Sequence, residues 1–121
     1  SGAFEAVQRA GIIAFRVARP FARRMSFVYR ARRDLVVDGL RTLGLPAPRP
    51  KAAIYVWTPV PPGRRAEEFA AWLMARADLL VTPGTGFGRH GAGFVRLSLT
   101  VPTERIREAC ARLERLAREL G

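Results

Sequence analysis

The sequence has few residues of the kinds that build disulfides, metal centres and covalent catalysts. Among its 121 residues there is one cysteine, Cys110, one histidine, His90, and one lysine, Lys51. A lone cysteine excludes a disulfide within the chain, and this set is too small for a zinc site of cysteine and histidine ligands. No nucleophile, base and orienting group can be assembled around His90, and Lys51 lies in a proline-rich segment unsuited to a Schiff-base lysine. We therefore expect no catalytic residue and no metal site in this chain.

Long apolar runs are also missing. The longest, Phe69–Ala75, has seven residues, whereas a membrane-spanning helix needs about 20. The start of the sequence, Ser1–Glu5, lacks the basic and apolar regions of a signal peptide. We expect a single globular domain with no membrane segment, because 49% of the residues are apolar and polar segments alternate with them. The missing signal peptide and the lone cysteine indicate a reduced cytoplasmic setting.

The charge is strongly positive, with a formal net charge of +11. All of the basic residues except Lys51 are arginine, and the segment 16–33 holds seven arginines and no acidic residue. Such a segment is typical either of a helix surface that faces solvent or a partner, or of a nucleic-acid footprint that neutralises phosphates. A basic α+β module that binds nucleic acid through Arg16 to Arg33 is therefore the alternative hypothesis for function.

The spacing of apolar residues predicts four helices and three strands. A helix over 3–18 is expected to end before Pro20, and a second helix to run from Pro20 until Gly44. An extended connector with three prolines follows over 44–50. The remaining elements are predicted as strands over 53–58, 79–82 and 94–100, a helix over 65–77, and a last helix from Pro102 or Thr103. This order predicts an α+β fold, a small and mostly antiparallel sheet backed by helices, with a helical lead-in over 1–44 and an α+β core over 45–121.

A loop with five glycines joins the last two predicted strands over 83–93. Closely spaced glycines can cradle a phosphate, but such loops connect a strand to a helix, so we predict a tight connection with several positive φ angles. The segment His90–Leu97 partly matches the RNA-binding motif of RRM domains, yet Ala92 and Leu97 stand where stacking aromatic rings are required. RNA binding through this strand is therefore not favoured.

Arg96 is the candidate binding residue. Alternation along the strand Phe94–Leu99 directs Val95, Leu97 and Leu99 to the core and Arg96 to the opposite face. A strand holds the planar guanidinium in a fixed position, where it can bind a carboxylate through two parallel hydrogen bonds. From the spacing alone, the favoured interpretation of Arg96 is an exposed arginine of the sheet surface.

The whole chain resembles the C-terminal part of class I/II, fold-type I aminotransferases, which use pyridoxal 5'-phosphate. The resemblance is strongest to the LL-diaminopimelate and N-succinyl-diaminopimelate aminotransferase subgroup, with alanine and aspartate aminotransferases as further relatives. Five segments in the order of the family carry it: Ser1-Gly-Ala-Phe-Glu-Ala-Val-Gln8, Tyr29-Arg-Ala-Arg-Arg-Asp34, Pro50-Lys-Ala-Ala-Ile-Tyr-Val-Trp57, Val81-Thr-Pro-Gly-Thr-Gly-Phe-Gly88 and Gly91-Ala-Gly-Phe-Val-Arg-Leu-Ser-Leu99.

The resemblance implies that the chain is the small domain of such an enzyme, without its large cofactor-binding domain. It implies that Arg96 binds the α-carboxylate of an amino acid or 2-oxo acid substrate and that Tyr55 lies beside the substrate. The family also implies a homodimeric full-length enzyme with pyridoxal 5'-phosphate bound to its large domain. We expect no cofactor on this chain alone and no transamination by it, since the family's cofactor-binding lysine lies upstream of its first residue.

Overall fold

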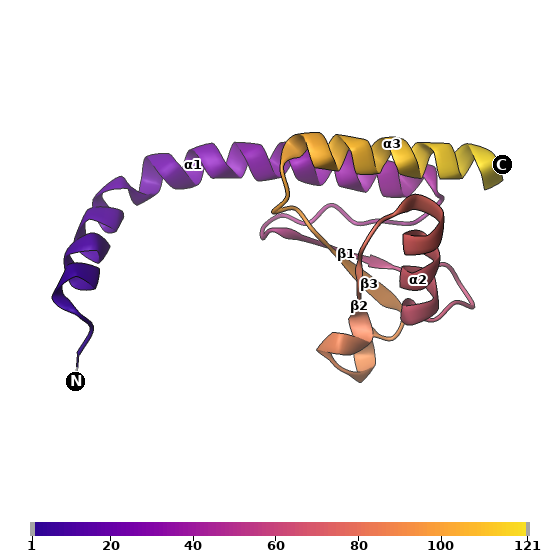
Figure 1. The fold of residues 1–121 in the computed structure, drawn as a ribbon, viewed down its shortest axis with the longest axis horizontal. Coiled ribbons are helices and arrows are strands. Elements are labelled where there is room, and N and C mark those ends of the chain that lie inside the picture. The colour runs from indigo at the N-terminus through magenta and orange to yellow at the C-terminus, as the bar shows by residue number, and fades with distance from the viewer. Residues whose placement is uncertain (1, 121) are drawn as a thin grey trace. The chain divides into compact units, whose positions relative to one another are not determined.

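The computed structural model describes residues 2–120 and contains helices and strands in one α+β arrangement (Figure 1). In chain order the elements are α1 (Glu5–Thr42), β1 (Tyr55–Pro59), α2 (Ala66–Ala77), β2 (Thr82–Pro83), the 3₁₀ turns η1 (Gly84–Phe87) and η2 (Arg89–Gly91), β3 (Phe94–Ser98) and α3 (Thr103–Leu120). The predicted α+β class with a small antiparallel sheet is confirmed. The chain forms two compact units, one up to Arg30 and one from Ala31 onward.

Helix α1 is continuous through Pro20, so the predicted break before that residue is wrong. A proline inside a helix loses one backbone hydrogen bond and costs about 3 kcal/mol, which is why the sequence indicated two helices. Helical periodicity is present on both sides of Pro20, and the backbone bonds of those flanking turns outweigh the loss of one bond. Figure 1 shows α1 bending within its N-terminal half, as is typical of a helix with an internal proline.

The first unit is a helix with an exposed apolar surface. None of residues 2–30 is buried, and large apolar side chains there are mostly open to solvent: Phe4, Val7, Ile12, Ile13, Phe15, Val17, Phe21 and Phe27. So many large apolar side chains exposed on one helix are unusual for a protein surface. The arginines of this unit are interspersed among these side chains.

The second unit is built around a three-stranded antiparallel sheet with the order β1–β3–β2. Strands β1 and β3 are shorter than predicted, and the strand predicted over 79–82 is wrong except at Thr82. Strand β1 begins at Tyr55 because Ala53 has a φ of 73°, which no extended strand adopts. Strand β2 has two residues only, because the chain leaves α2 through Asp78 with a φ of 50° and residues 79–81 form no ladder. Strand β3 ends at Ser98.

The core of the second unit lies between one face of the sheet and the helices. The predicted inward residues of β3, Val95 and Leu97, and Leu99 just beyond it, are buried as expected. The other large buried side chains come from β1, α2, α3 and the last turns of α1: Val56, Phe69, Leu73, Ile106, Leu113, Leu116, Val37 and Leu40. Helix α3 lies alongside this C-terminal part of α1 (Figure 1), where a Cβ on Gly39 would be 3.2 Å from the Cys110 sulfur.

Two arginines near the C-terminal end of the basic segment donate to backbone and side-chain oxygens of the second unit. The Arg32 guanidinium donates to the Leu99 carbonyl oxygen and to the Thr103 hydroxyl oxygen, both at 3.0 Å. Arg33 donates to the Pro50 carbonyl oxygen at 3.0 Å. These bonds hold the connections on either side of the sheet against α1, so both arginines have structural roles.

Cys110 is buried, and its Sγ donates to the Leu35 carbonyl oxygen at 3.3 Å. Burial raises the pKa of this thiol, with nearby acidic residues as a further cause. Over residues 2–120, no group of three or more histidine, cysteine or acidic side chains is placed to hold a metal ion. No helix in the same range combines enough length and apolar character to cross a membrane.

Candidate functional site

Arg96 lies at the centre of the sheet, on its middle strand. Its backbone is paired with Trp57 of β1 on one side and with Thr82 of β2 on the other. Because its neighbours Val95 and Leu97 point into the core, the Arg96 side chain extends from the opposite face, where it is half-buried. A backbone that is hydrogen-bonded on both sides fixes where this side chain starts.

The Tyr55 ring packs against the Arg96 guanidinium. Tyr55 is paired with Ser98, so it is the diagonal neighbour of Arg96 on the same face of the sheet. The central carbon of the guanidinium lies 4.1 Å from the ring centroid, well inside the range of a cation–π interaction. The structure therefore brings together the two residues that the sequence analysis selected.

A second ring, Phe87, contacts the same guanidinium from turn η1. Its centroid is 4.3 Å from the central carbon of Arg96. Phe87 also meets Trp57 edge to face, with centroids 5.8 Å apart, and Trp57 stacks on Phe94 at 5.5 Å. The sequence analysis did not select Phe87 or Trp57. Trp57 could have been found from the alternation of β1, whereas no local pattern places Phe87 next to Arg96.

The glycine-rich loop brings Phe87 to this face by a very close backbone approach. A Cβ on Gly84 would be 2.2 Å from the Gly91 carbonyl oxygen and 2.9 Å from a Trp57 ring carbon. The expected series of positive φ angles is wrong, since within this loop only Gly88 has one, at 118°. Gly84 and Gly91 are needed because two backbone segments meet there, and a side chain would separate them.

Turn η1 is tied to helix α2 by one side-chain bond. The Thr85 hydroxyl donates to the carboxylate of Glu67, in the first turn of α2. This bond is the main cause that lowers the pKa of Glu67 below its usual value, with its own backbone N–H and Arg65 as further causes. The turn that carries Phe87 is thus anchored at its start, two residues before the ring.

The guanidinium of Arg96 has no acidic partner among residues 2–120, where ion pairs form elsewhere. Its N–H groups also make no hydrogen bond to any described residue. Two rings cover this cation, and its donors are available to an anion from outside the chain. A carboxylate is the small anion whose two oxygens match the spacing of those donors.

His90 and Lys51 take no part in this arrangement of rings and guanidinium. His90 is exposed in η2 and accepts a hydrogen bond from Arg89 at 3.2 Å. Lys51 is exposed in the connector that precedes β1.

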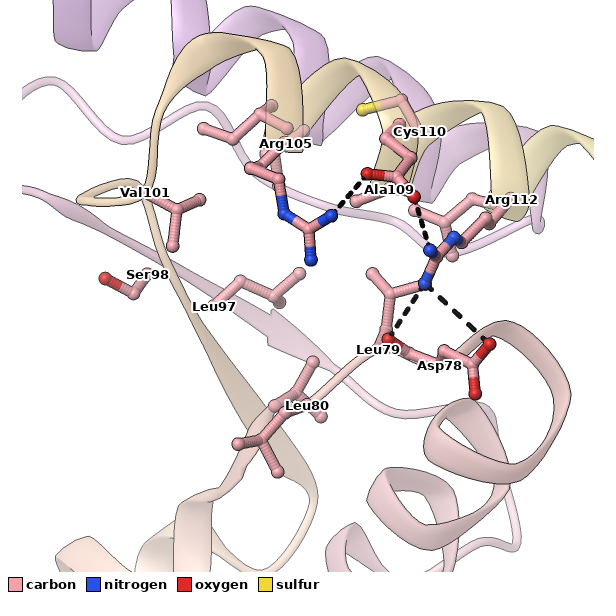
Figure 2. A pocket seen from close by; sticks show the side chains of 15 residues that line it. Asp78, Leu79, Leu80, Leu97, Ser98, Val101, Arg105, Ala109, Cys110 and Arg112 are labelled. Carbon is pink, nitrogen blue, oxygen red and sulfur yellow. Dashed lines mark hydrogen bonds and ion pairs between the residues drawn. The ribbon is translucent and has the colours of Figure 1, made fainter.

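A separate apolar cavity of about 290 Å³ lies between α3, residues 78–81 and the end of β3 (Figure 2). Neither Arg96 nor Tyr55 lines it. At its rim Glu108 binds Arg105 at 2.7 Å and Arg112 at 2.5 Å, and Arg112 also donates to the Asp78 carbonyl oxygen at 3.4 Å. Since these arginines already have acidic partners, the cavity lacks the open donors of the Arg96 site.

Comparisons with known proteins agree on one family. The model of the family "Aminotransferase class I and II" matches residues 6–113. LL-diaminopimelate aminotransferase from Gloeobacter violaceus is 45% identical over 115 residues, which cover 94% of this chain and 29% of that protein. The enzyme of the same name from Moorella thermoacetica is 44% identical over 121 residues, covering 100% and 30%. No match in these comparisons supports the nucleic-acid-binding alternative.

Solved structures show the same relationship. An aminotransferase from Staphylococcus aureus matches with a TM-score of 0.85 and 38% identity, covering 97% of this chain and 31% of the other. L,L-diaminopimelate aminotransferase from Chlamydomonas reinhardtii matches with a TM-score of 0.85 and 26% identity, covering 97% and 29%. The chain spans about 30% of the length of the curated relatives it matches. On this evidence the chain belongs to the class I and II aminotransferase family.

Proposed function

We propose that this chain is the substrate-carboxylate-binding domain of an enzyme that transfers an amino group between an amino acid and a 2-oxo acid. The observation that carries the proposal is the environment of the Arg96 guanidinium. Its guanidinium projects from the central strand, lies against Tyr55 and Phe87, and has no acidic partner among the described residues. Every amino acid and 2-oxo acid that the reaction could use has an α-carboxylate, which is the group that this guanidinium fits.

The contribution of Arg96 is orientation. Two parallel hydrogen bonds from a planar guanidinium fix the plane of a carboxylate as well as its position. Amino-group transfer requires the bonds at the α-carbon to be held at a defined angle, so a clamp on the neighbouring carboxylate lowers the barrier by positioning. Lysine would supply the same charge but not the second bond or the plane.

The substrate is proposed to be an amino acid of the diaminopimelate class. Relatives with more than 40% identity carry the name LL-diaminopimelate aminotransferase. Such a molecule has an α-carboxylate at each end, and Arg96 binds the one at the reacting end. The chain's own residues account for this one contact, and the remaining contacts with the substrate belong to the rest of the enzyme.

The residues of this chain do not fit the cofactor of the family, pyridoxal 5'-phosphate. That cofactor acts as an electron sink and is held through a lysine in a buried, enclosing site. The one lysine here, Lys51, is exposed in an irregular connector, and it has neither the burial nor the neighbouring groups of such a site. We propose that the cofactor is held by another part of the full-length enzyme.

The first unit is proposed to pack against that other part. Phe4, Phe15 and Phe27 are 76%, 87% and 70% exposed, although aromatic side chains of this size are rarely left in water together. The length of the relatives leaves room for a large additional domain. A homodimeric full-length enzyme would cover further surface of the same helix.

Replacing Arg96 by lysine in the full-length enzyme tests the proposed function. We expect the KM for the amino acid to rise about 10-fold or more, because loss of the second hydrogen bond removes about 1.4 kcal/mol or more of binding. Arg89→Lys is the matched control, since Arg89 is exposed in the neighbouring turn and contacts only His90 among the described residues. An unchanged KM in Arg96→Lys, with the control equal to wild type, would refute the role of Arg96.

A further inference from the structure

We propose that Phe87 is a positioning residue for substrate binding, which acts by holding the Arg96 guanidinium between its own ring and that of Tyr55. This inference rests on the proposed function of Arg96 as the carboxylate-binding group. It adds a residue and a mechanism to it: the arginine is preorganised by two aromatic rings, one from the sheet and one from turn η1.

Both rings lie against the guanidinium. Its central carbon is 4.1 Å from the Tyr55 centroid and 4.3 Å from the Phe87 centroid. Tyr55 and Phe87 make no ring contact with each other among the described residues, so each ring contacts the guanidinium on its own. Aromatic faces attract a guanidinium without using its N–H donors. The donors at its edge thus stay available for a carboxylate.

Phe87 is itself held in place. Its ring meets Trp57 edge to face, and Trp57 is fixed in β1 directly opposite Arg96. The start of η1 is anchored by the bond from Thr85 to Glu67. A free arginine side chain samples many rotamers and loses that freedom on binding a ligand. Two fixed rings remove much of this freedom before the substrate arrives, which favours binding.

Phe87 is poorly explained as a residue of the hydrophobic core. Phe87 is 51% exposed, whereas Val95 and Phe69 in the core of the same unit are 0% and 1% exposed. Shortening an exposed side chain leaves no internal cavity, so the fold tolerates it. The structure therefore allows its effect on substrate binding to be measured separately from an effect on stability.

The experiment compares Phe87→Leu with Phe87→Tyr in the full-length holoenzyme. Leucine keeps the apolar bulk but removes the aromatic face, and tyrosine keeps the face. We expect Phe87→Leu to raise the KM for the amino acid about 5-fold with a smaller change in kcat, and Phe87→Tyr to stay within about 2-fold of wild type. Leu80→Ala is the matched control, because Leu80 is an aliphatic residue that is 84% exposed, and the rings against Arg96 are those of Tyr55 and Phe87.

A substrate without the carboxylate separates positioning from a general structural role. Single-turnover rates are measured with the amino acid and with the primary amine that lacks its α-carboxylate. If Phe87 acts through Arg96, Phe87→Leu slows the reaction of the amino acid at subsaturating concentration and leaves that of the amine unchanged. Equal slowing with both compounds would mean that Phe87 serves only the local fold, and the inference would be wrong.

The double variant of Phe87→Leu and Arg96→Lys distinguishes the two proposals. If Phe87 acts through Arg96, its effect is much smaller in the Arg96→Lys background than in wild type, because interacting residues are not additive. Full additivity overturns the positioning role while leaving the carboxylate-binding role intact. If Arg96→Lys alone has no effect on the KM, the proposed function itself fails.

Discussion

Thr85 in turn η1 donates its hydroxyl hydrogen to the carboxylate of Glu67 in the first turn of helix α2. The bond joins two elements that are separated by a strand in the chain, and it lies two residues from the ring that covers Arg96. Because an ionised carboxylate accepts this bond more strongly than a protonated one, the anchoring of η1 depends on pH.

Stability should therefore fall in acid partly through Glu67. Its pKa is lowered in the folded chain, mainly by the Thr85 bond, so its contribution is present above the ordinary value of 4.5 and is lost as the pH falls through the lower folded value. We expect Glu67→Gln to unfold at a lower temperature than wild type at neutral pH, with the difference closing below about pH 4. Thermal melts from neutral to acidic pH check this, with Glu68→Gln as the control. A difference that stays constant with pH would contradict the prediction.

Tyr55 offers a test of how the second ring works. If its ring supports the guanidinium, Tyr55→Phe keeps the KM of the full-length enzyme within about 2-fold of wild type, and Tyr55→Leu raises it about 5-fold. If instead the hydroxyl group of Tyr55 contacts the substrate, Tyr55→Phe shows the larger part of the loss. Steady-state kinetics of the two variants, measured side by side, decides between these roles.

Gly84 should not tolerate even a methyl group. A Cβ there would lie 2.2 Å from the Gly91 carbonyl oxygen and 2.7 Å from that of Phe94, and backbone atoms cannot rotate away as a side chain does. We expect Gly84→Ala to lower the free energy of unfolding by about 1–3 kcal/mol. Gly86→Ala is the control, since nothing lies within 4 Å of a Cβ at that position. Denaturant titrations of both variants measure the difference, and equal stability would contradict the close approach.

Cys110 should be an unreactive thiol in the folded chain. Its side chain is 7% exposed, and burial raises its pKa, which lowers the fraction of reactive thiolate. We expect alkylation by iodoacetamide near pH 8 to be at least about 10-fold slower than in denaturant. The variant Cys110→Ala with Ala111→Cys places the only thiol at an exposed neighbouring position and should react rapidly. Fast reaction of the native Cys110 would show that the α3 contact opens readily.

The features most accessible from the sequence were those set by local periodicity. Helix α2 follows its prediction closely, and the alternation along β3 correctly sends Val95 and Leu97 inward and Arg96 outward. The spacing of apolar residues along a helix or strand determines which of its faces packs on the core, so these features follow from the sequence. The diagonal contact of Tyr55 with Arg96 needs the strand register as well, and only the family resemblance pointed to it.

Other features depend on contacts that spacing does not encode. Pro20 was read as a helix end by its local chemistry, although the turns on both sides keep α1 continuous. The placement of Phe87 follows from the meeting of Gly84 with Gly91, which is a tertiary contact between two backbone segments. The glycines of the loop over 83–93 led to a prediction of positive φ angles, whereas the structure uses Gly84 and Gly91 for close backbone packing.

The basic segment of α1 does not act as one uniform surface. Arg32 donates hydrogen bonds to Leu99 and Thr103, and Arg33 donates one to Pro50, all within the second unit. Fewer arginines of this segment are therefore available to bind an external anion than its positive charge suggests. In a scan of alanine replacements from Arg16 to Arg33, the replacements of Arg32 and Arg33 would therefore remove hydrogen bonds of the fold itself.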